Sequence, residues 1–94
     1  MYSCAYNYQW DPQKNRENYS NHGIWFADAI TVFLDESAHT MEDDYQNEER
    51  FITMGMDAEC RILVVVYTWR GNDVRIISAR KATRKERKEY GRKR

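Results

Sequence analysis

The chain has 94 residues, 32% of them charged and 14% aromatic, and its Lys and Arg residues equal its Asp and Glu residues in number. This length predicts a single domain over residues 1–94 with a modest apolar core. No apolar run approaches the roughly 20 residues of a membrane span. Because the N-terminus also lacks a basic-then-apolar leader pattern, we expect a cytoplasmic protein with no membrane partner.

The net charge of zero hides two segments of opposite sign. Residues 70–94 hold eleven Lys and Arg against three Asp and Glu, and residues 1–69 hold four against twelve. A basic end in a small domain favours a polyanion or an acidic protein as partner. A solvated helix face with a frayed tail would explain the same charges, and charge alone does not decide between the two interpretations.

A short strand and a helix are the first predicted elements. The segment YNYQW, residues 6–10, is aromatic and alternates weakly, which predicts a strand. Asp11 is a good helix cap, and Pro12 is favoured at the first helical position. Gly23 suits a left-handed helix end. We therefore expect a helix over residues 12–22.

The next segment, IWFADAITVF, carries apolar side chains three and four residues apart. This spacing predicts a second helix from about Trp25 to Phe33 that packs onto a sheet. The acidic residues 34–48 follow, with no Lys or Arg among them. A structureless loop of this length is unusual in a compact domain, so we expect a short edge strand over residues 38–42 and a turn over residues 43–47.

Three clear strands and a helix complete the chain. The strands are ERFITMGM, RILVVVYTW and DVRIISAR, and their short links predict an antiparallel meander. Residues 62–66 are apolar on both faces, as in a central strand covered on both sides. Residues 82–90 are helix formers without an apolar stripe. The expected fold is α+β, with N-terminal helices and a C-terminal helix packed on an antiparallel meander sheet.

The sequence contains no motif for a nucleotide cofactor or a metal. It lacks GxGxxG, GxxxxGK[ST], HExxH and paired CxxC motifs. Cys4 and Cys60 are interpreted as a tail residue and a turn residue, not as a disulfide. We therefore expect neither a cofactor nor a metal site. The remaining cations, His and Tyr residues suit RNA cleavage by the adjacent 2′-hydroxyl, which needs a base, an acid and cations around the phosphorus but no obligatory metal.

Four residues are candidates for catalysis. Arg80 closes the last strand and Arg84 follows one turn later, so their guanidinium groups are expected to share a phosphate. An ion pair between Arg80 and the acidic segment is the alternative. His22 is either a general base or a side chain that contacts the terminal carbonyls of its helix. Lys14 either reaches a phosphate or packs on Trp10.

Further residues are candidates for RNA binding. Arg75 and Arg80 face opposite sides of a regular strand, so both reach the RNA only if a bulge intervenes. Tyr67 either stacks on a base or belongs to the core. Glu49 and Glu86 become candidate bases only if burial raises their pKa. The basic terminal helix contributes two expected phosphate contacts: Lys85 and Lys88.

Together these segments resemble the BrnT family of bacterial toxins. WDPQKNRENYSNHGIWFADA, EERFITMGM, RILVVVYTWRG and RIISARKATRKERKEY match the family in order and spacing over about residues 8–90. Trp25 departs from the pattern, since many relatives carry a small capping residue such as Ser there, so the second helix is expected to begin differently. The matching positions are Trp10, Asp11, Lys14, His22 and Gly23 in the opening motif and Ser78, Arg80, Ala82, Arg84, Glu86 and Tyr90 in the closing one.

The resemblance implies a ribonuclease toxin of a type II toxin–antitoxin system, with a RelE-like fold, that arrests growth by blocking translation. It implies an RNA substrate and a BrnA-type ribbon-helix-helix antitoxin, with operator DNA contacted only through that antitoxin. The basic end would serve RNA phosphates in the unpartnered toxin and an acidic antitoxin segment in the complex. Two other functions stay open: a nucleic-acid-binding module without catalysis, and a degenerate toxin that is a subunit of an autorepressor complex.

Overall fold

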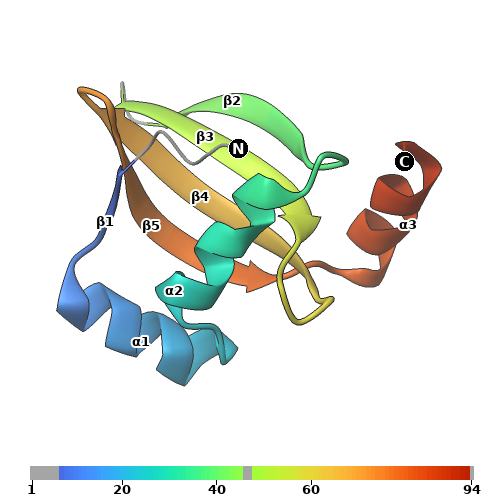
Figure 1. The fold of residues 1–94 in the computed structure, drawn as a ribbon, viewed down its shortest axis with the longest axis horizontal. Coiled ribbons are helices and arrows are strands. Elements are labelled where there is room, and N and C mark those ends of the chain that lie inside the picture. The colour runs from blue at the N-terminus through green and yellow to red at the C-terminus, as the bar shows by residue number, and fades with distance from the viewer. Residues whose placement is uncertain (1–6, 46–47, 94) are drawn as a thin grey trace.

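A five-stranded sheet with the strand order β1-β5-β4-β3-β2 organises the fold (Figure 1). The computed structural model describes residues 7–45 and 48–93. The predicted α+β class is confirmed. In chain order the elements are β1 (Asn7–Gln9), α1 (Pro12–His22), α2 (Phe26–Ala29), the 3-10 helix η1 (Ile30–Leu34), β2 (His39–Tyr45), β3 (Glu48–Met56), β4 (Ile62–Arg70), β5 (Asp73–Lys81) and α3 (Arg84–Lys93).

The sheet is mixed, although an antiparallel sheet was predicted. Strands β2 to β5 form the expected antiparallel meander. Strand β1 adds to the β5 edge in parallel, with Gln9 opposite Arg75. Strand β2 continues to Tyr45, beyond the predicted end at Glu42. Its extra residues belong to the predicted turn over residues 43–47, of which 46 and 47 lie outside the described residues.

Helix α1 occupies its predicted residues because its two capping residues act as expected. The side chain of Asp11 accepts a hydrogen bond from the backbone N–H of Gln13 at 2.8 Å. Gly23 adopts the left-handed conformation with φ 72°, and its N–H donates to the carbonyl of Tyr19 at 2.8 Å. Helix α1 lies along the β5 edge of the sheet (Figure 1).

The second predicted helix is two shorter elements, α2 and η1. Trp25 stands at the N-cap of α2 but makes no side-chain capping bond. Instead, Asn15 Oδ1 of α1 accepts a hydrogen bond from the N–H of Phe26 at 2.8 Å. The helix therefore begins with an acceptor supplied from another helix, and this compensates for the large residue at position 25.

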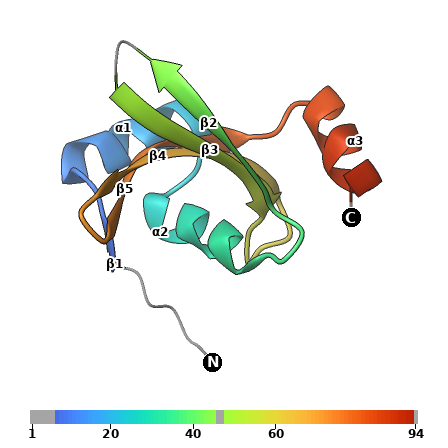
Figure 2. The same cartoon turned by 90° about the horizontal axis from the view of Figure 1, so that it is seen from above.

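The apolar core lies between α2 and η1 and one face of the sheet, which curves around them (Figure 2). We call this the core face, and the opposite one the outer face. Gly55 of β3 lets η1 approach closely, since a Cβ there would lie 2.9 Å from Ala38 Cβ and 3.3 Å from the carbonyl oxygen of Val32. The largest fully buried side chains are Phe26, Ile24, Leu63, Ile76, Val32, Val65 and Thr53.

A β-bulge in β5 determines which side chains share the outer face. Ile77 is the extra residue, because the partner in β5 changes from Ile76 to Ser78 over one step of β4. In a regular strand, Arg75 and Arg80 would face opposite sides. The bulge between them places both side chains on the same side, as was required for Arg75 and Arg80 to share one face.

Helix α3 begins at Arg84 and lies beyond one end of the sheet (Figures 1 and 2). It starts later than predicted because Thr83 caps it: Thr83 Oγ1 accepts from the N–H of Glu86 at 3.2 Å, and Glu86 Oε1 accepts from the N–H of Thr83 at 2.8 Å. This reciprocal pair is a capping box. Tyr90 is 4% exposed and donates its hydroxyl proton to Asp35 at 2.5 Å, which fastens the helix to the end of η1.

Among the described residues, none of the helices is both long enough and apolar enough to cross a membrane.

Candidate functional site

Four cations from four different elements line one groove on the outer face. They are Lys14 of α1, Arg50 of β3, Arg70 of β4 and Arg75 of β5. We call this the basic groove. Thr68 and the acidic residue Glu48 also line the groove. The carboxylate of Glu48 lies 3.7 Å from a terminal nitrogen of Arg50. Because cations outnumber acids along its walls, the groove is suited to an anionic ligand.

Strand β1 positions Arg75 at the edge of this groove. Arg75 Nη1 donates to Gln9 Oε1 at 3.0 Å, and Gln9 Nε2 in turn donates to Asp73 Oδ2 at 3.1 Å. A guanidinium group has five N–H donors in a planar fork. The bond to Gln9 therefore orients Arg75 and leaves it further donors for the oxygens of a phosphate.

A second hollow adjoins the basic groove at Lys14. Five residues of α1 and two residues of the bulge line it: Lys14, Glu17, Asn18, Asn21, His22, Ile77 and Ser78. We call it the His22 hollow. Lys14 and Ile77 line both the hollow and the groove. Lys14, Asn18 and His22 follow one another at four-residue spacing, so they share one face of the helix.

Arg80, in contrast, is bonded within the protein. Its Nη1 and Nη2 donate to the two carboxylate oxygens of Glu86 at 2.8 and 2.9 Å. The hydrogen bond from Arg80 is the main cause that lowers the pKa of Glu86 from 4.5 to about 2, with the backbone of Thr83 second. The same hydrogen bond raises the pKa of Arg80. Arg80 is thus in an ion pair, but with α3 and not with the acidic segment.

This ion pair changes two expectations. Both terminal nitrogens of Arg80 are engaged with Glu86, so a phosphate shared by Arg80 and Arg84 has to compete with that carboxylate. The structure also lowers the pKa of Glu86, whereas a role as general base required the pKa to rise. The condition under which Glu86 would be a candidate base is therefore not met.

Tyr67 belongs to the core. It is 5% exposed, its ring lies 5.0 Å from that of Phe33 and 5.8 Å from that of Phe51, and its hydroxyl bonds Thr53 Oγ1 at 3.0 Å. A buried ring cannot stack on a nucleobase, so the expectation that Tyr67 binds RNA is wrong. Arg84, Lys85 and Lys88 are exposed on α3, away from the residues that line the basic groove.

Arg50 and Arg70 are groove residues that the sequence analysis missed. A signal for them was present, because β3 and β4 form a hairpin whose inward side chains include Thr53, Val65 and Tyr67. Strict alternation from these buried positions places Arg50 and Arg70 on the opposite face. From the predicted set, the structure thus places Lys14 and His22 in one cavity and Lys14 and Arg75 in the adjoining one, and it adds these two cations to the second.

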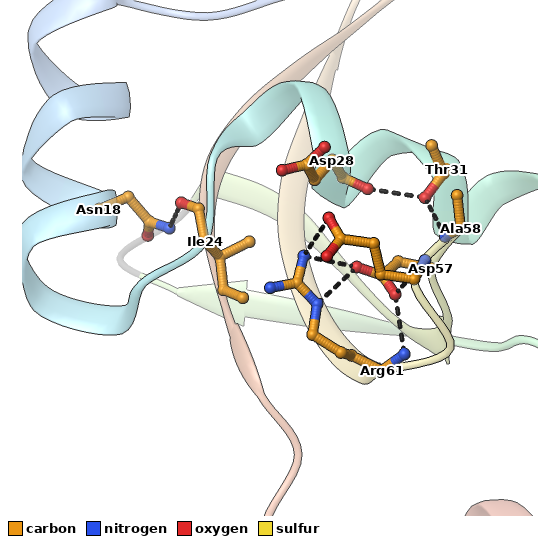
Figure 3. A network of polar contacts seen from close by, with 8 residues as sticks. Asn18, Ile24, Asp28, Thr31, Asp57, Ala58 and Arg61 are labelled. Atoms are coloured by element: carbon orange, nitrogen blue, oxygen red, sulfur yellow. Dashed lines mark hydrogen bonds and ion pairs between the residues drawn. The ribbon is translucent and has the colours of Figure 1, made fainter.

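Buried polar side chains hold the surrounding loops in place (Figure 3). Asp57, 5% exposed, accepts hydrogen bonds from the guanidinium Nε of Arg61 at 2.9 Å and from the backbone N–H of the same residue at 2.8 Å. The side-chain bond to Asp57 raises the pKa of Arg61. Thr31 Oγ1 accepts from the N–H of Ala58 at 2.8 Å, which ties the β3–β4 turn to η1. These contacts lie away from the basic groove and stabilise the fold.

Within the described parts of the chain, no three or more His, Cys, Asp and Glu side chains gather into a set that could hold a metal ion.

Comparisons with known proteins identify the family and the fold of this chain. Residues 10–86 match the family described as "Ribonuclease toxin, BrnT, of type II toxin-antitoxin system". The fold is similar to the 1.1 Å crystal structure of the Brucella abortus ribonuclease toxin, BrnT, with a TM-score of 0.69 and 24% sequence identity over 85% of this chain and 100% of that chain. No curated protein matches. Since the family match spans most of the sequence, from Trp10 to Glu86, the chain belongs to the BrnT family of ribonuclease toxins of type II toxin–antitoxin systems.

Proposed function

We propose that this chain is a metal-independent endoribonuclease toxin that cleaves RNA where the basic groove meets the His22 hollow. Family membership supports the ribonuclease activity. One observation carries the assignment to this site: Lys14 lines both cavities, so the hollow that contains His22 adjoins the groove that contains the arginines.

The chemistry follows from the residue types. Lys14, Arg70 and Arg75 hold the phosphodiester and stabilise the negative charge that builds on the pentacoordinate phosphorus. His22 accepts the proton of the ribose 2′-hydroxyl. The 2′-oxygen then bonds to phosphorus while the bond to the 5′-oxygen breaks, and that oxygen takes up a proton from water. The products carry a 2′,3′-cyclic phosphate and a 5′-hydroxyl.

The cations beyond the groove extend the RNA path. Arg80 lies on the same face of the sheet as Arg75, and Arg84 begins the exposed helix α3. We infer that RNA leaving the groove passes the junction of β5 and α3. A phosphate there competes with Glu86 for Arg80, while Lys85 and Lys88 add contacts to the backbone.

The family also implies a partner. A BrnA-type ribbon-helix-helix antitoxin is the proposed inhibitor, with operator DNA reached only through that antitoxin, in the bacterial cytoplasm. We also infer that the helices are arranged on the sheet as in RelE-type toxins. The family description, which names a type II toxin–antitoxin system, supports the existence of an antitoxin. Co-expression of a BrnA-type antitoxin is expected to restore growth, and the antitoxin is expected to copurify with this chain.

An RNA cleavage assay with chelator tests the function. Purified protein is incubated with end-labelled single-stranded RNA in EDTA, and the product ends are identified. We expect cleavage that leaves a 2′,3′-cyclic phosphate, and much slower cleavage by Lys14→Ala. Arg16→Ala is the matched control, because Arg16 is an exposed cation of the same helix that lines neither cavity.

The same assay separates the other functions. Stable RNA complexes without cleavage would favour a binding module. If the chain shows no cleavage in vitro and causes no growth arrest when it is expressed alone, these results would favour a degenerate toxin that survives as a repressor subunit.

A further inference from the structure

Asn18 is buried although it lies on a helix whose neighbouring side chains face solvent. It is 6% exposed, and its amide makes three hydrogen bonds. Nδ2 donates to the carbonyls of Ile24 and Ala79, both at 2.9 Å, and Oδ1 accepts from the N–H of Ala79 at 3.1 Å. Figure 3 shows the bond to Ile24. Both amide donors and an acceptor position are therefore used.

The two bonds to Ala79 replace a missing strand. Strand β1 pairs with β5 only from Asp73 to Arg75, whereas β5 continues to Lys81. Beyond that pairing, the edge of β5 needs partners for its backbone groups. The amide of Asn18 offers Ala79 a donor and an acceptor side by side, as a peptide group of a neighbouring strand would. One side chain thus fixes α1 to the edge of the sheet.

This fixation occurs in the middle of the site. Lys14 lies one turn before Asn18 and His22 one turn after it, and all three line the His22 hollow. Ala79 directly follows Ser78 of the bulge and directly precedes Arg80. Asn18 therefore connects the helix that carries the lysine and the histidine to the strand that carries the guanidinium groups.

We propose that Asn18 is a positioning residue for RNA cleavage, which sets the separation of Lys14 and His22 from β5 through its bonds to the backbone of Ala79. The inference rests on the proposed function, in which Lys14 and His22 act on RNA. Asn18 contacts no reacting atom. It acts because a displacement of about 1 Å in a catalytic group lowers the rate about 100-fold.

The first test compares two buried polar residues. Asn18→Ala is expected to lower kcat about 100-fold with KM for a single-stranded RNA within about twofold of wild type, because transition-state alignment is lost while phosphate binding remains. Thr53→Val is the matched control. Thr53 is 2% exposed and bonds Thr40 and Tyr67 away from both cavities. It is expected to lower the Tm while kcat stays within about twofold.

Both variants are assayed below their Tm, with folding verified by circular dichroism. Folded Asn18→Ala with the wild-type kcat would overturn the proposal. If Asn18→Ala does not fold, Asn18→Ser is used, since its hydroxyl can bond one backbone group of Ala79. A kcat between those of wild type and Lys14→Ala is then expected for Asn18→Ser, and a wild-type kcat in that variant would equally overturn the proposal.

A double-mutant cycle tests whether Asn18 acts through Lys14. If it does, Asn18→Ala combined with Lys14→Ala loses little more activity than the more damaging single change. Losses that multiply would show an independent, purely structural effect and contradict the proposal. Slow cleavage by Lys14→Ala together with full activity of Asn18→Ala would leave the proposed function intact and remove only this inference. A wild-type protein that does not cleave RNA removes both.

Discussion

The outer face has two regions rich in guanidinium groups, and they differ in what each group faces. In the basic groove, cations from four elements line an open cavity whose acid is Glu48. At the junction of β5 and α3, Arg80 makes a two-bond pair with Glu86, whose pKa falls to about 2 as a result. The comparison teaches that the residue type alone does not locate an anion site, because a cation held in a two-bond pair with a carboxylate has fewer donors left for another anion.

The two regions also differ in how they respond to a bound phosphate. Phosphate in the basic groove relieves the mutual repulsion of cations that the fold holds together. Phosphate at the junction must displace a carboxylate that also caps α3. We therefore expect substitutions in the groove to change catalysis, and substitutions at the junction to change stability first.

The largest expected effect is the difference in kcat/KM between variants of Arg75 and variants of Arg80. Arg75→Ala removes a phosphate donor and is expected to lower kcat/KM about 100-fold while the Tm stays close to wild type. Arg80→Ala is expected to lower kcat/KM about tenfold at most, and to lower the Tm. Steady-state cleavage kinetics and thermal unfolding measure both. A folded Arg80→Ala variant that is less active than Arg75→Ala would reverse the comparison.

The next effect concerns the stability of α3. Glu86→Gln weakens both the pair with Arg80 and the capping box, and we expect the free energy of unfolding to fall by about 1–2 kcal/mol. Urea titration measures it. Glu89→Gln is the control on the same helix, with an expected change of about 0.5 kcal/mol or less because Glu89 is exposed. Equal losses in the two variants would show that the pair contributes nothing specific.

The pH dependence of stability gives a further test. The pKa of Glu86 is lowered in the folded protein from 4.5 to about 2, so its contribution is fully present above about pH 4.5 and is lost as the pH falls toward 2. The difference in free energy of unfolding between wild type and Glu86→Gln should therefore shrink over this range. A constant difference from pH 6 to pH 2 would show that Glu86 titrates normally in the folded state.

The smallest expected effect belongs to the exposed lysines of α3. If Lys85 and Lys88 contact phosphates outside the groove, each substitution by Ala lowers the slope of log affinity against log salt by about 0.7 for single-stranded RNA. The kcat should not change. Binding of an RNA with 2′-deoxy substitutions at the cleavage positions, titrated with KCl, measures the slope. Slopes equal to that of wild type would confine the RNA to the basic groove.

Local signals in the sequence determined much of the fold. Helix α1 was predicted to the residue because Asp11, Pro12 and Gly23 act through contacts with near neighbours. The capping box of Thr83 and Glu86 was equally local, but it was overlooked, and the predicted start of α3 was therefore too early. In contrast, the pairing of β1 with β5 joins residues more than 60 positions apart, and no spacing within either strand specifies it.

The candidate site was harder to predict because it depends on registers and partners. Arg75 and Arg80 share a face only through the bulge at Ile77, and an isoleucine gives no signal for a bulge. Tyr67 and Trp69 follow the same alternation, yet their exposed fractions are 5% and 39%, and the packing of Tyr67 on Phe33 of η1 cannot be inferred from that alternation. The partner of Arg80 was likewise a matter of three-dimensional arrangement, since Glu86 is oriented by its own helix cap.

The acceptor that Asn15 supplies to α2 also affects which residues position 25 can tolerate. The first turn of α2 receives its capping acceptor from α1, so residue 25 does not need to cap the helix. The indole ring of Trp25 instead stacks on Tyr19, with 4.1 Å between the ring centroids. We therefore expect substitution of Trp25 to be tolerated while Asn15 is present, and loss of Asn15 to destabilise α2 unless residue 25 can cap it.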